Sequence, residues 1–265
     1  GAIRLVIGGT GLIAWAYWRG ALRNSRPWPV VAVVTAAAAV AAYQPLFFSA
    51  VFETGVAVGT VVAIGSAPLF AGLLGAMLLK EKLDLRWGLA TGLAILGCVL
   101  LFATGERSGI NLVGITLALG AGLAYAVYAT TGKIILRTHS ADALGAAVFG
   151  LAAVFLLPLL GARDVSWAPN PRNLILLLHL GLITTTVAYI LFARGLRLIT
   201  VATAVTLSLA EPLTAATLGL FLLGEERTVT VLAGMLLLIG GLAILARRPA
   251  AVEEVPAPPD ISGTR

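Results

Sequence analysis

Long apolar runs occupy almost the whole chain and leave only short connectors between them. A helix needs about 20 apolar residues to cross the hydrocarbon core of a bilayer, because each residue adds only about 1.5 Å. Reading the chain for such runs gives nine candidate spans, at residues 2–18, 29–52, 55–79, 86–103, 110–131, 142–161, 172–193, 200–223 and 228–246. We therefore predict an all-α polytopic membrane protein, with the lipid bilayer as an obligatory partner.

The composition excludes the soluble classes of protein. Hydrophobic residues make up 59% of the chain and charged residues 11%, whereas a soluble domain has about 25% charged residues. Cys98 is the single cysteine and lies inside an apolar run, so an internal disulfide cannot staple a small secreted fold. The short connectors also leave no room for a soluble catalytic domain.

Lys and Arg fall mainly in alternate connectors, which indicates the orientation in the membrane. The net charge of +6 is not gathered in one patch, so no nucleic-acid partner is expected. The richer set of connectors holds Arg19, Arg23, Arg26, Lys80, Lys82, Arg86, Lys133, Arg137, Arg194, Arg197, Arg247 and Arg248. Cytoplasmic loops carry the excess of basic residues. We therefore predict a multi-pass protein of the cytoplasmic membrane, with its C-terminus in the cytoplasm.

One segment of the sequence occurs twice. The run PLFAGLLGAMLLKE at 68–81 matches PLTAATLGLFLLGE at 212–225, at a constant offset of 144 residues. Glu81 falls in a connector of the basic end, whereas Glu225 falls in a connector of the opposite end. Copies of opposite topology are typical of secondary transporters.

The offset also predicts how the chain is divided. Shifting the run 110–131 back by 144 residues gives positions before Gly1. We therefore expect an inverted five-plus-five helix repeat in which nine spans are present and the first helix is missing; a protein of nine helices is the alternative. The first copy would be residues 1–105 and the second 106–248. Residues 249–265 are rich in Pro and polar residues, which predicts a disordered cytoplasmic tail.

Several motifs carry a resemblance to a known family. They are Glu211-Pro212-Leu213 and Leu222-Leu223-Gly224-Glu225 in the second copy, and Pro68-Leu69 and Leu79-Lys80-Glu81 in the first. In combination they resemble the EamA-type transporters of the drug/metabolite transporter superfamily. Arg4, which we expect near a membrane edge, is similar to a basic residue that opens the second helix in that family. The resemblance extends to about residue 246.

The resemblance implies a fold and a function. Members have ten helices in two inverted units, both termini in the cytoplasm and a central substrate cavity that the first helix helps to line. Most export or facilitate amino acids, metabolites and drugs, often using proton or other gradients. The resemblance thus implies a secondary transporter, most simply an exporter, that works by alternating access. We also expect no cofactor and a monomer, with a homodimer left open.

Glu211 is the strongest candidate for a functional residue. It lies near the middle of the run 200–223, where an ionised carboxylate facing lipid costs about 2.5–3.5 kcal/mol or more. It could bind a cationic group of a substrate and could exchange a proton during transport. The alternative is a neutral, hydrogen-bonded Glu that only braces the chain at Pro212. Ala67 stands at the matching position of the first copy, and this asymmetry favours a functional role.

Two prolines are predicted to interrupt their helices. Proline lacks an N–H and collides with the preceding turn, so Pro68 and Pro212 should free carbonyl groups near the middle of the membrane. Gly65 and Ser66 precede Pro68 and should make that segment deformable. We interpret Gly65, Pro68 and Pro212 as candidate gating positions, with a static kink as the alternative.

Other polar side chains within apolar runs are candidates for binding a substrate. Such groups face a cavity or a neighbouring helix, and single ones often serve only to join helices. The candidates are Tyr43, Gln44, Ser66, Tyr125, Tyr128, Thr185 and Tyr189, together with Glu211. They predict a pocket that suits a partly apolar small-molecule substrate. The pairs Gly88/Gly92 and Gly55/Gly59 have the spacing of close helix packing.

The sequence offers no motif for catalysis. It contains no phosphate-binding loop of the Gly-x-x-x-x-Gly-Lys-Ser/Thr type and no His-Glu-x-x-His zinc motif. No catalytic or metal-binding residue is therefore predicted, and the chain is not expected to be an enzyme. Two alternatives to a transporter remain open: a non-catalytic membrane assembly subunit, and a membrane enzyme that processes lipids.

Overall fold

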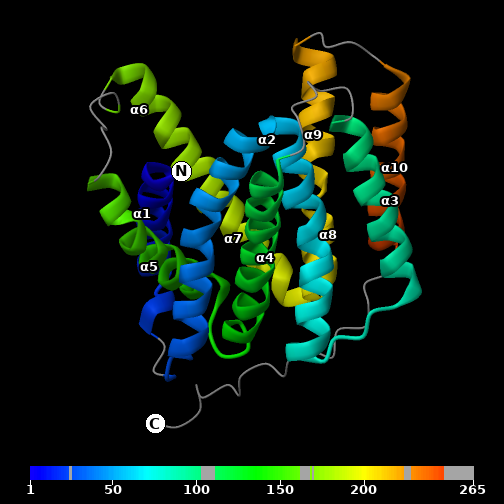
Figure 1. Ribbon diagram of the computed structural model, residues 1–265. Helices are drawn as coiled ribbons and strands as arrows, with labels where there is room; N and C mark the ends of the chain where they lie inside the picture. Colours follow the sequence, from blue (N-terminus) through cyan, green and yellow to red (C-terminus); the bar gives the residue numbers. More distant parts are fainter. Residues whose placement is uncertain (24–25, 103–110, 162–167, 169, 224–227, 248–265) are drawn as a thin grey trace.

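A computed structural model describes residues 1–23, 26–102, 111–161, 168, 170–223 and 228–247, and within these residues every regular element is helical. Figure 1 shows the helices running up and down in one bundle. The elements are α1 (Ala2–Trp18), η1 (Ala21–Arg23), α2 (Val30–Leu79), α3 (Leu85–Phe102), α4 (Leu112–Ile135), α5 (Ala141–Gly161), α6 (Pro171–Leu178), η2 (His179–Val187), α7 (Ala188–Leu198), α8 (Val201–Leu207), α9 (Ala210–Leu218), η3 (Gly219–Leu223) and α10 (Val229–Ala246).

The apolar helices confirm a membrane protein. Seven helical segments of the described residues are long and apolar enough to cross a bilayer, and α1 is a shorter apolar helix. Many of their large apolar side chains are exposed on the outside of the bundle, where a soluble protein would carry charge. The predicted tail at 249–265 lies outside the described residues.

Helix α2 bends back on itself at one residue. Its 50 residues would extend about 75 Å, more than twice the hydrocarbon thickness of about 30 Å. Gly55 interrupts it with φ 81° and ψ 161°, a conformation that glycine adopts without steric cost. In Figure 1 the blue first arm rises to this point and the cyan second arm descends. The runs 29–52 and 55–79 thus form the two arms.

The two prolines of the repeated segment behave differently. Pro68 is buried inside α2, whose single non-helical residue is Gly55, so the interruption predicted at Pro68 is not found. Pro212 lies in the first turn of α9, where its missing N–H costs no hydrogen bond. The interruption beside it falls at Ser208 and Leu209, between α8 and α9.

Small residues let the helices of the bundle approach closely. Helix α2 packs mainly on α4, α1 on α5, and α3 on α10. A Cβ atom on Gly97 would lie 2.6 Å from the Gly234 carbonyl oxygen, and one on Gly241 would lie 2.6 Å from the Ala90 carbonyl oxygen. The α3–α10 contact is therefore backbone against backbone. The glycine pair predicted to pack closely on α3, Gly88/Gly92, instead faces open space.

Candidate functional site

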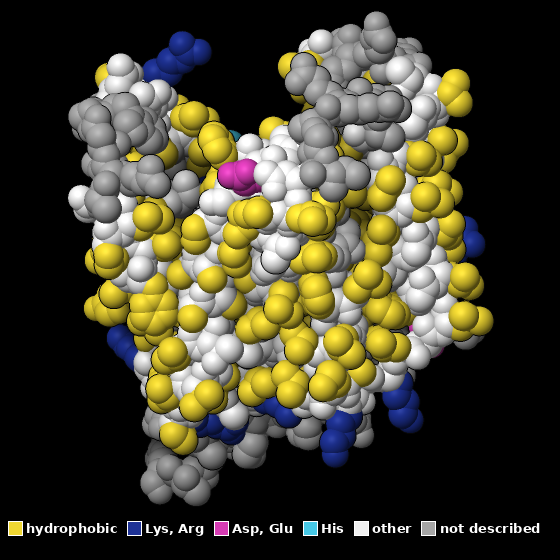
Figure 2. Space-filling view, viewed as in Figure 1, with side chains coloured by type: hydrophobic (Ala, Val, Ile, Leu, Met, Phe, Trp, Pro, Cys, Tyr) yellow, Lys and Arg dark blue, Asp and Glu magenta, His cyan; other side chains and the backbone are white. Residues whose placement is uncertain are grey.

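A cavity of about 920 Å³ lies inside the bundle. Its lining comes from α1, α2, α4, η2, α7, α8 and α9. The lining residues are Arg4, Tyr43, Gln44, Phe47, Phe48, Thr60, Ala63, Ile64, Ala67, Tyr125, Leu180, Thr184, Ala188, Tyr189, Phe192, Val205, Leu207, Ser208, Ala210 and Glu211. Figure 2 shows the surface hollowed at the upper edge, whereas most Lys and Arg side chains lie along the lower edge. We call that lower edge the basic end.

Most of the predicted binding residues come together at this cavity. Tyr43, Gln44, Tyr125, Tyr189 and Glu211 all line it, although they are spread over four helices and nearly 170 positions of sequence. Tyr128 lines a smaller adjoining cavity that shares Tyr43, Gln44, Tyr125 and Tyr189 with the main one. Whether these residues bind a substrate stays a prediction.

Two of the predicted binding residues lie outside the lining. Ser66 donates a hydrogen bond to the Ala63 carbonyl (3.2 Å) and stands against Gly122 of α4. Thr185 is buried, donates to the Leu180 carbonyl (2.9 Å) and packs its methyl group on Gly8 of α1. Both side chains join helices, which is the alternative role that single polar residues often have in membrane bundles.

The predicted gating residues lie beside the cavity without lining it. Gly65 and Pro68 are buried in the second arm of α2, and their neighbour Ala67 reaches the cavity. Pro212 is buried next to Glu211, which does line the cavity. Their place is compatible with motion next to a bound ligand, and a gating role stays a prediction.

Aromatic rings form one wall of the cavity. The ring centroids of Tyr43 and Tyr125 are 6.4 Å apart, those of Tyr125 and Phe192 are 6.0 Å apart, and those of Tyr189 and Phe192 are 6.3 Å apart. The Tyr125 hydroxyl also makes a hydrogen bond of 3.0 Å with Ser208 at the α8–α9 break. This wall combines apolar surface with hydroxyl groups, as in sites that bind small molecules with an apolar part.

Arg4 is the charged lining residue that was not predicted from the sequence. Its charge indicated a position near a membrane edge, but the first turn of α1 turns the guanidinium group toward both cavities. The Arg4 Nε atom is buried and has no hydrogen-bond partner among the described residues. The signal that could have found it is the charge itself, because a permanent charge within a spanning helix usually faces a cavity.

Glu211 is the acidic side chain of the cavity. It sits in the first turn of α9, directly after the α8–α9 break, where a helix N-terminus favours negative charge. Among the described residues no other Asp or Glu lines the cavity. Glu211 and Arg4 act on each other electrostatically, yet the described residues contain no ion pair between them.

Polar contacts join helices at the basic end. The Glu81 carboxylate accepts hydrogen bonds from the Val201 N–H (2.9 and 3.0 Å) at the start of α8. Lys133 Nζ donates to the carbonyl groups of Leu196 (2.6 Å) and Ile199 (2.9 Å) at the end of α7. An anion at a helix N-terminus and a cation at a helix C-terminus both complement the helix dipole. Glu81 and Lys133 thus form hydrogen bonds to the two sides of the turn between α7 and α8.

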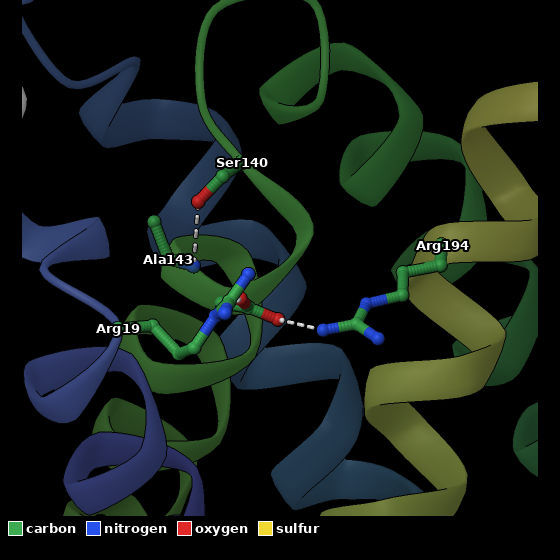
Figure 3. A network of polar contacts seen from close by, with 5 residues as sticks. Arg19, Ser140, Ala143 and Arg194 are labelled. Atoms are coloured by element: carbon green, nitrogen blue, oxygen red, sulfur yellow. Dashed lines mark hydrogen bonds and ion pairs between the residues drawn. The ribbon is translucent and has the colours of Figure 1, made fainter.

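A second set of contacts lies at the same end. Asp142, in the first turn of α5, is 3.2 Å from Arg194 of α7 and 3.8 Å from Arg19 after α1. Figure 3 shows the two arginines approaching from opposite sides, beside the hydrogen bond from the Ala143 N–H to the Ser140 hydroxyl. These contacts tie α1, α5 and α7 together.

The site has the make-up of a small-molecule binding cavity. Within the described residues, no three His, Cys, Asp or Glu side chains are placed to hold a metal ion. A multi-helix membrane protein with a large, mostly apolar central cavity and one opposed pair of charges fits the class of membrane transporters.

Comparison with known proteins also indicates a membrane transporter. The EamA-like transporter family matches residues 1–103 and 112–247, so this chain belongs to that family. The uncharacterized transporter YwfM of Bacillus subtilis is 45% identical over 94% of this chain and 84% of its own length. The threonine/homoserine exporter RhtA of Escherichia coli is 27% identical over 80% of this chain and 75% of its own.

A solved structure supports the fold. One protein crystal structure superposes with a TM-score of 0.79 over 93% of this chain and 87% of its own, at 23% identity. At that identity the likeness is evidence for the fold alone. The family match by itself confirms the transporter family expected from the sequence motifs.

Proposed function

We propose that this chain is a secondary transporter that exports small metabolites, amino acids or drugs across the cytoplasmic membrane by alternating access. The observation that carries the proposal is the cavity of about 920 Å³ that contains Glu211, together with the contact between Glu81 and Val201 at the basic end. Its volume is within the range of small-molecule sites, about 300–1,000 Å³. The resemblance to a threonine/homoserine exporter supports amino acids as the first class of substrate to test.

The proposed architecture is the inverted five-plus-five repeat, with nine spans present and copies at 1–105 and 106–248. Helix bounds support it, because the offset of 144 residues carries Leu85–Phe102 of α3 onto Val229–Ala246 of α10. Glycine contacts support it too. Gly97 meets Gly234 and Leu238, while its counterpart Gly241 meets Ala90 and Ala94, the counterparts of that pair. Such reciprocal contacts between counterpart residues are expected of two helices related by a pseudo-twofold axis.

The proposed orientation follows from the basic end. Because Lys and Arg accumulate on the cytoplasmic side, we place that end and the C-terminus in the cytoplasm. The cavity then opens to the outside in this conformation. A bound substrate would contact Glu211, Tyr43, Gln44, Tyr125 and Tyr189.

A transport assay tests the function. Purified protein in vesicles loaded with unlabelled threonine or homoserine should take up the labelled compound by exchange, faster than protein-free vesicles. Thr184→Trp should reduce the rate at least several-fold, because Thr184 lines the cavity and the indole would fill part of it. Ile183→Trp is the matched control, since Ile183 is the next residue, lies outside the lining and is exposed.

The assay separates the transporter from the other classes. Exchange that exceeds the vesicle background and responds to Thr184→Trp supports transport. Absence of exchange with any amino acid, nucleoside, sugar or cationic drug, combined with stoichiometric co-purification of another protein, would instead identify an assembly subunit.

Alternating access requires that the contacts at the basic end break. Replacing Glu81 with Gln should weaken its hold on α8, because hydrogen bonds to a charged group contribute about 1.5–3 kcal/mol. The cytoplasmic end should then open more often, by about tenfold or more. Gly75 lets this contact form, since a Cβ there would lie 2.6 Å from a Glu81 carboxylate oxygen.

Labelling of a single cysteine measures this opening. Cys98→Ser removes the one native cysteine, and Ala202→Cys then places a thiol at a buried position next to Val201. N-ethylmaleimide should label this thiol several-fold faster in the Glu81→Gln variant. Lys82→Gln, an adjacent exposed change of charge, should leave the rate unchanged. Equal rates for all three proteins would contradict the role of Glu81 in closure.

A further inference from the structure

Two opposite charges face one cavity without neutralising each other directly. Arg4 comes from α1 and Glu211 from α9, and among the described residues of the lining they are the only Lys, Arg, Asp or Glu side chains. They interact across the cavity, but the described ion pairs do not include one between them. The cavity therefore presents a positive and a negative group to whatever enters it.

Unsatisfied polar atoms lie beside these charges. The Arg4 Nε atom is a buried donor with no acceptor, and the Gln44 Oε1 atom is a buried acceptor with no donor, among the described residues. Gln44 is only 5% exposed, and both residues line the main cavity and the smaller one. Buried polar groups are nearly always paired in native structures. A ligand that brings both an acceptor and a donor would satisfy both atoms.

Charge balance restricts which ligand fits. An arginine guanidinium stays protonated in proteins, so the charges of Arg4 and an ionised Glu211 add up to zero. A cation or an anion would leave one net charge within the membrane-spanning part of the protein, which is costly. A zwitterion keeps the sum at zero and gives each protein charge a partner.

We propose that the cavity selects small zwitterions, with Arg4 holding the carboxylate and with Gln44 Oε1 and Glu211 accepting hydrogen bonds from the ammonium group. This inference rests on the transport function proposed above. The planar guanidinium can bind both oxygens of a carboxylate at once, and the carboxylate of Glu211 accepts from an ammonium. The aromatic wall of Tyr125 and Phe192 then meets the apolar part of the molecule. Arg4 is a specificity-determining residue in this arrangement.

Matched sets of compounds test the selectivity. Each set holds the zwitterion, the amine without the carboxylate, and the acid without the amine. The first is leucine, 3-methylbutylamine and 4-methylpentanoate; the second is phenylalanine, 2-phenylethylamine and 3-phenylpropanoate; the third is threonine, 1-amino-2-propanol and 3-hydroxybutanoate. Dissociation constants come from the ligand-dependent thermal shift of the purified protein. In at least one set the zwitterion should bind at least about tenfold tighter than both partners.

Replacing either charged residue should change which compound of a set binds most tightly, and the two replacements should favour different compounds. Arg4→Gln leaves a net negative cavity, so it should weaken the zwitterion about 10- to 100-fold and favour the amine. Glu211→Gln leaves a net positive cavity and should favour the acid. Arg4→Lys keeps the charge without the planar fork and should lie between wild type and Arg4→Gln. Arg23→Gln, on an exposed residue remote from the cavity, is the control.

The outcomes separate this inference from the function on which it rests. If the wild-type protein binds the amine as tightly as the zwitterion, or if Arg4→Gln leaves zwitterion affinity unchanged, the inference is overturned and transport stands. If the exchange assay shows no flux with any compound, both are overturned. If Arg4→Gln does not give a monodisperse protein, the Arg4→Lys and Glu211→Gln variants still show whether the ligand preference changes in the proposed direction.

Discussion

Transport driven by a pH gradient is expected to fall to the vesicle background when Glu211 is replaced by Gln. One carboxylate cannot carry a proton and pair with an ammonium group at the same time. Competition between proton and substrate for Glu211 would therefore couple their movement in opposite directions. Gln keeps the size of the side chain but can neither take up a proton nor hold a charge, so a driven flux should disappear while binding weakens about 10- to 100-fold.

The ionisable groups around Glu211 single it out as the candidate for proton exchange. The ionisable groups that face it are Arg4 of α1, Tyr43 of α2, Tyr125 of α4 and Tyr189 of α7. The tyrosines are neutral and the arginine charged throughout the usual range of transport assays. Glu211 is thus the one group of this set that can change its charge between the two sides of the membrane.

Uptake into vesicles with and without an imposed pH gradient measures the coupling. Glu211→Asp, which keeps the carboxylate, should retain a dependence on the gradient at a reduced rate. Glu53→Gln is the control, because Glu53 lies outside the lining and accepts a hydrogen bond from Asn111 (2.7 Å). If Glu211→Gln keeps the pH dependence of the wild type, proton coupling through this residue is ruled out.

The sequence predicts the membrane class and the helix positions well because the bilayer imposes a length and a polarity on every span. The apolar run 86–103 differs from α3 by one residue at each end, and 228–246 differs from α10 by one residue at its start. The turn at Gly55 falls where the predicted run 29–52 ends and the run 55–79 begins. The interruption predicted at Pro68 was wrong, because that proline stays within a helical backbone.

The cavity residues were only partly predictable, because composition does not show which side of each helix faces the cavity. Thr184, Thr185 and Thr186 are adjacent, and only Thr184 lines the cavity. The segment His179–Val187 is a π-helix, in which Thr185 and Thr186 donate to carbonyls five residues earlier. The wider turn changes which side chains face the cavity. Arg4 was missed because its distance from the bundle axis depends on helices far away in sequence.

The largest effect on stability is expected where α3 meets α10. Replacing Gly97 with Leu should lower the free energy of unfolding by about 3 kcal/mol, because the added side chain would have to displace the backbone of the neighbouring helix. The Gly234 carbonyl oxygen lies 2.6 Å from a Cβ at this position, and Leu238 N lies 2.8 Å from it. Backbone atoms within a helix cannot rotate away as a side chain can.

Position Gly92 provides the matched control on the same helix. It is exposed, and a Cβ there has no atom within 4 Å, so Gly92→Leu should leave stability unchanged or raise it by about 0.5–1 kcal/mol through better helix propensity. Thermal unfolding of the purified variants in detergent measures the difference. By the proposed repeat, Gly241→Leu should match Gly97→Leu, since its Cβ would meet the Ala90 carbonyl oxygen at 2.6 Å. A loss for Gly92→Leu as large as that for Gly97→Leu would show that α3 and α10 do not meet through these glycines. A large difference between Gly97→Leu and Gly241→Leu would count against the pseudo-twofold relation of the two helices.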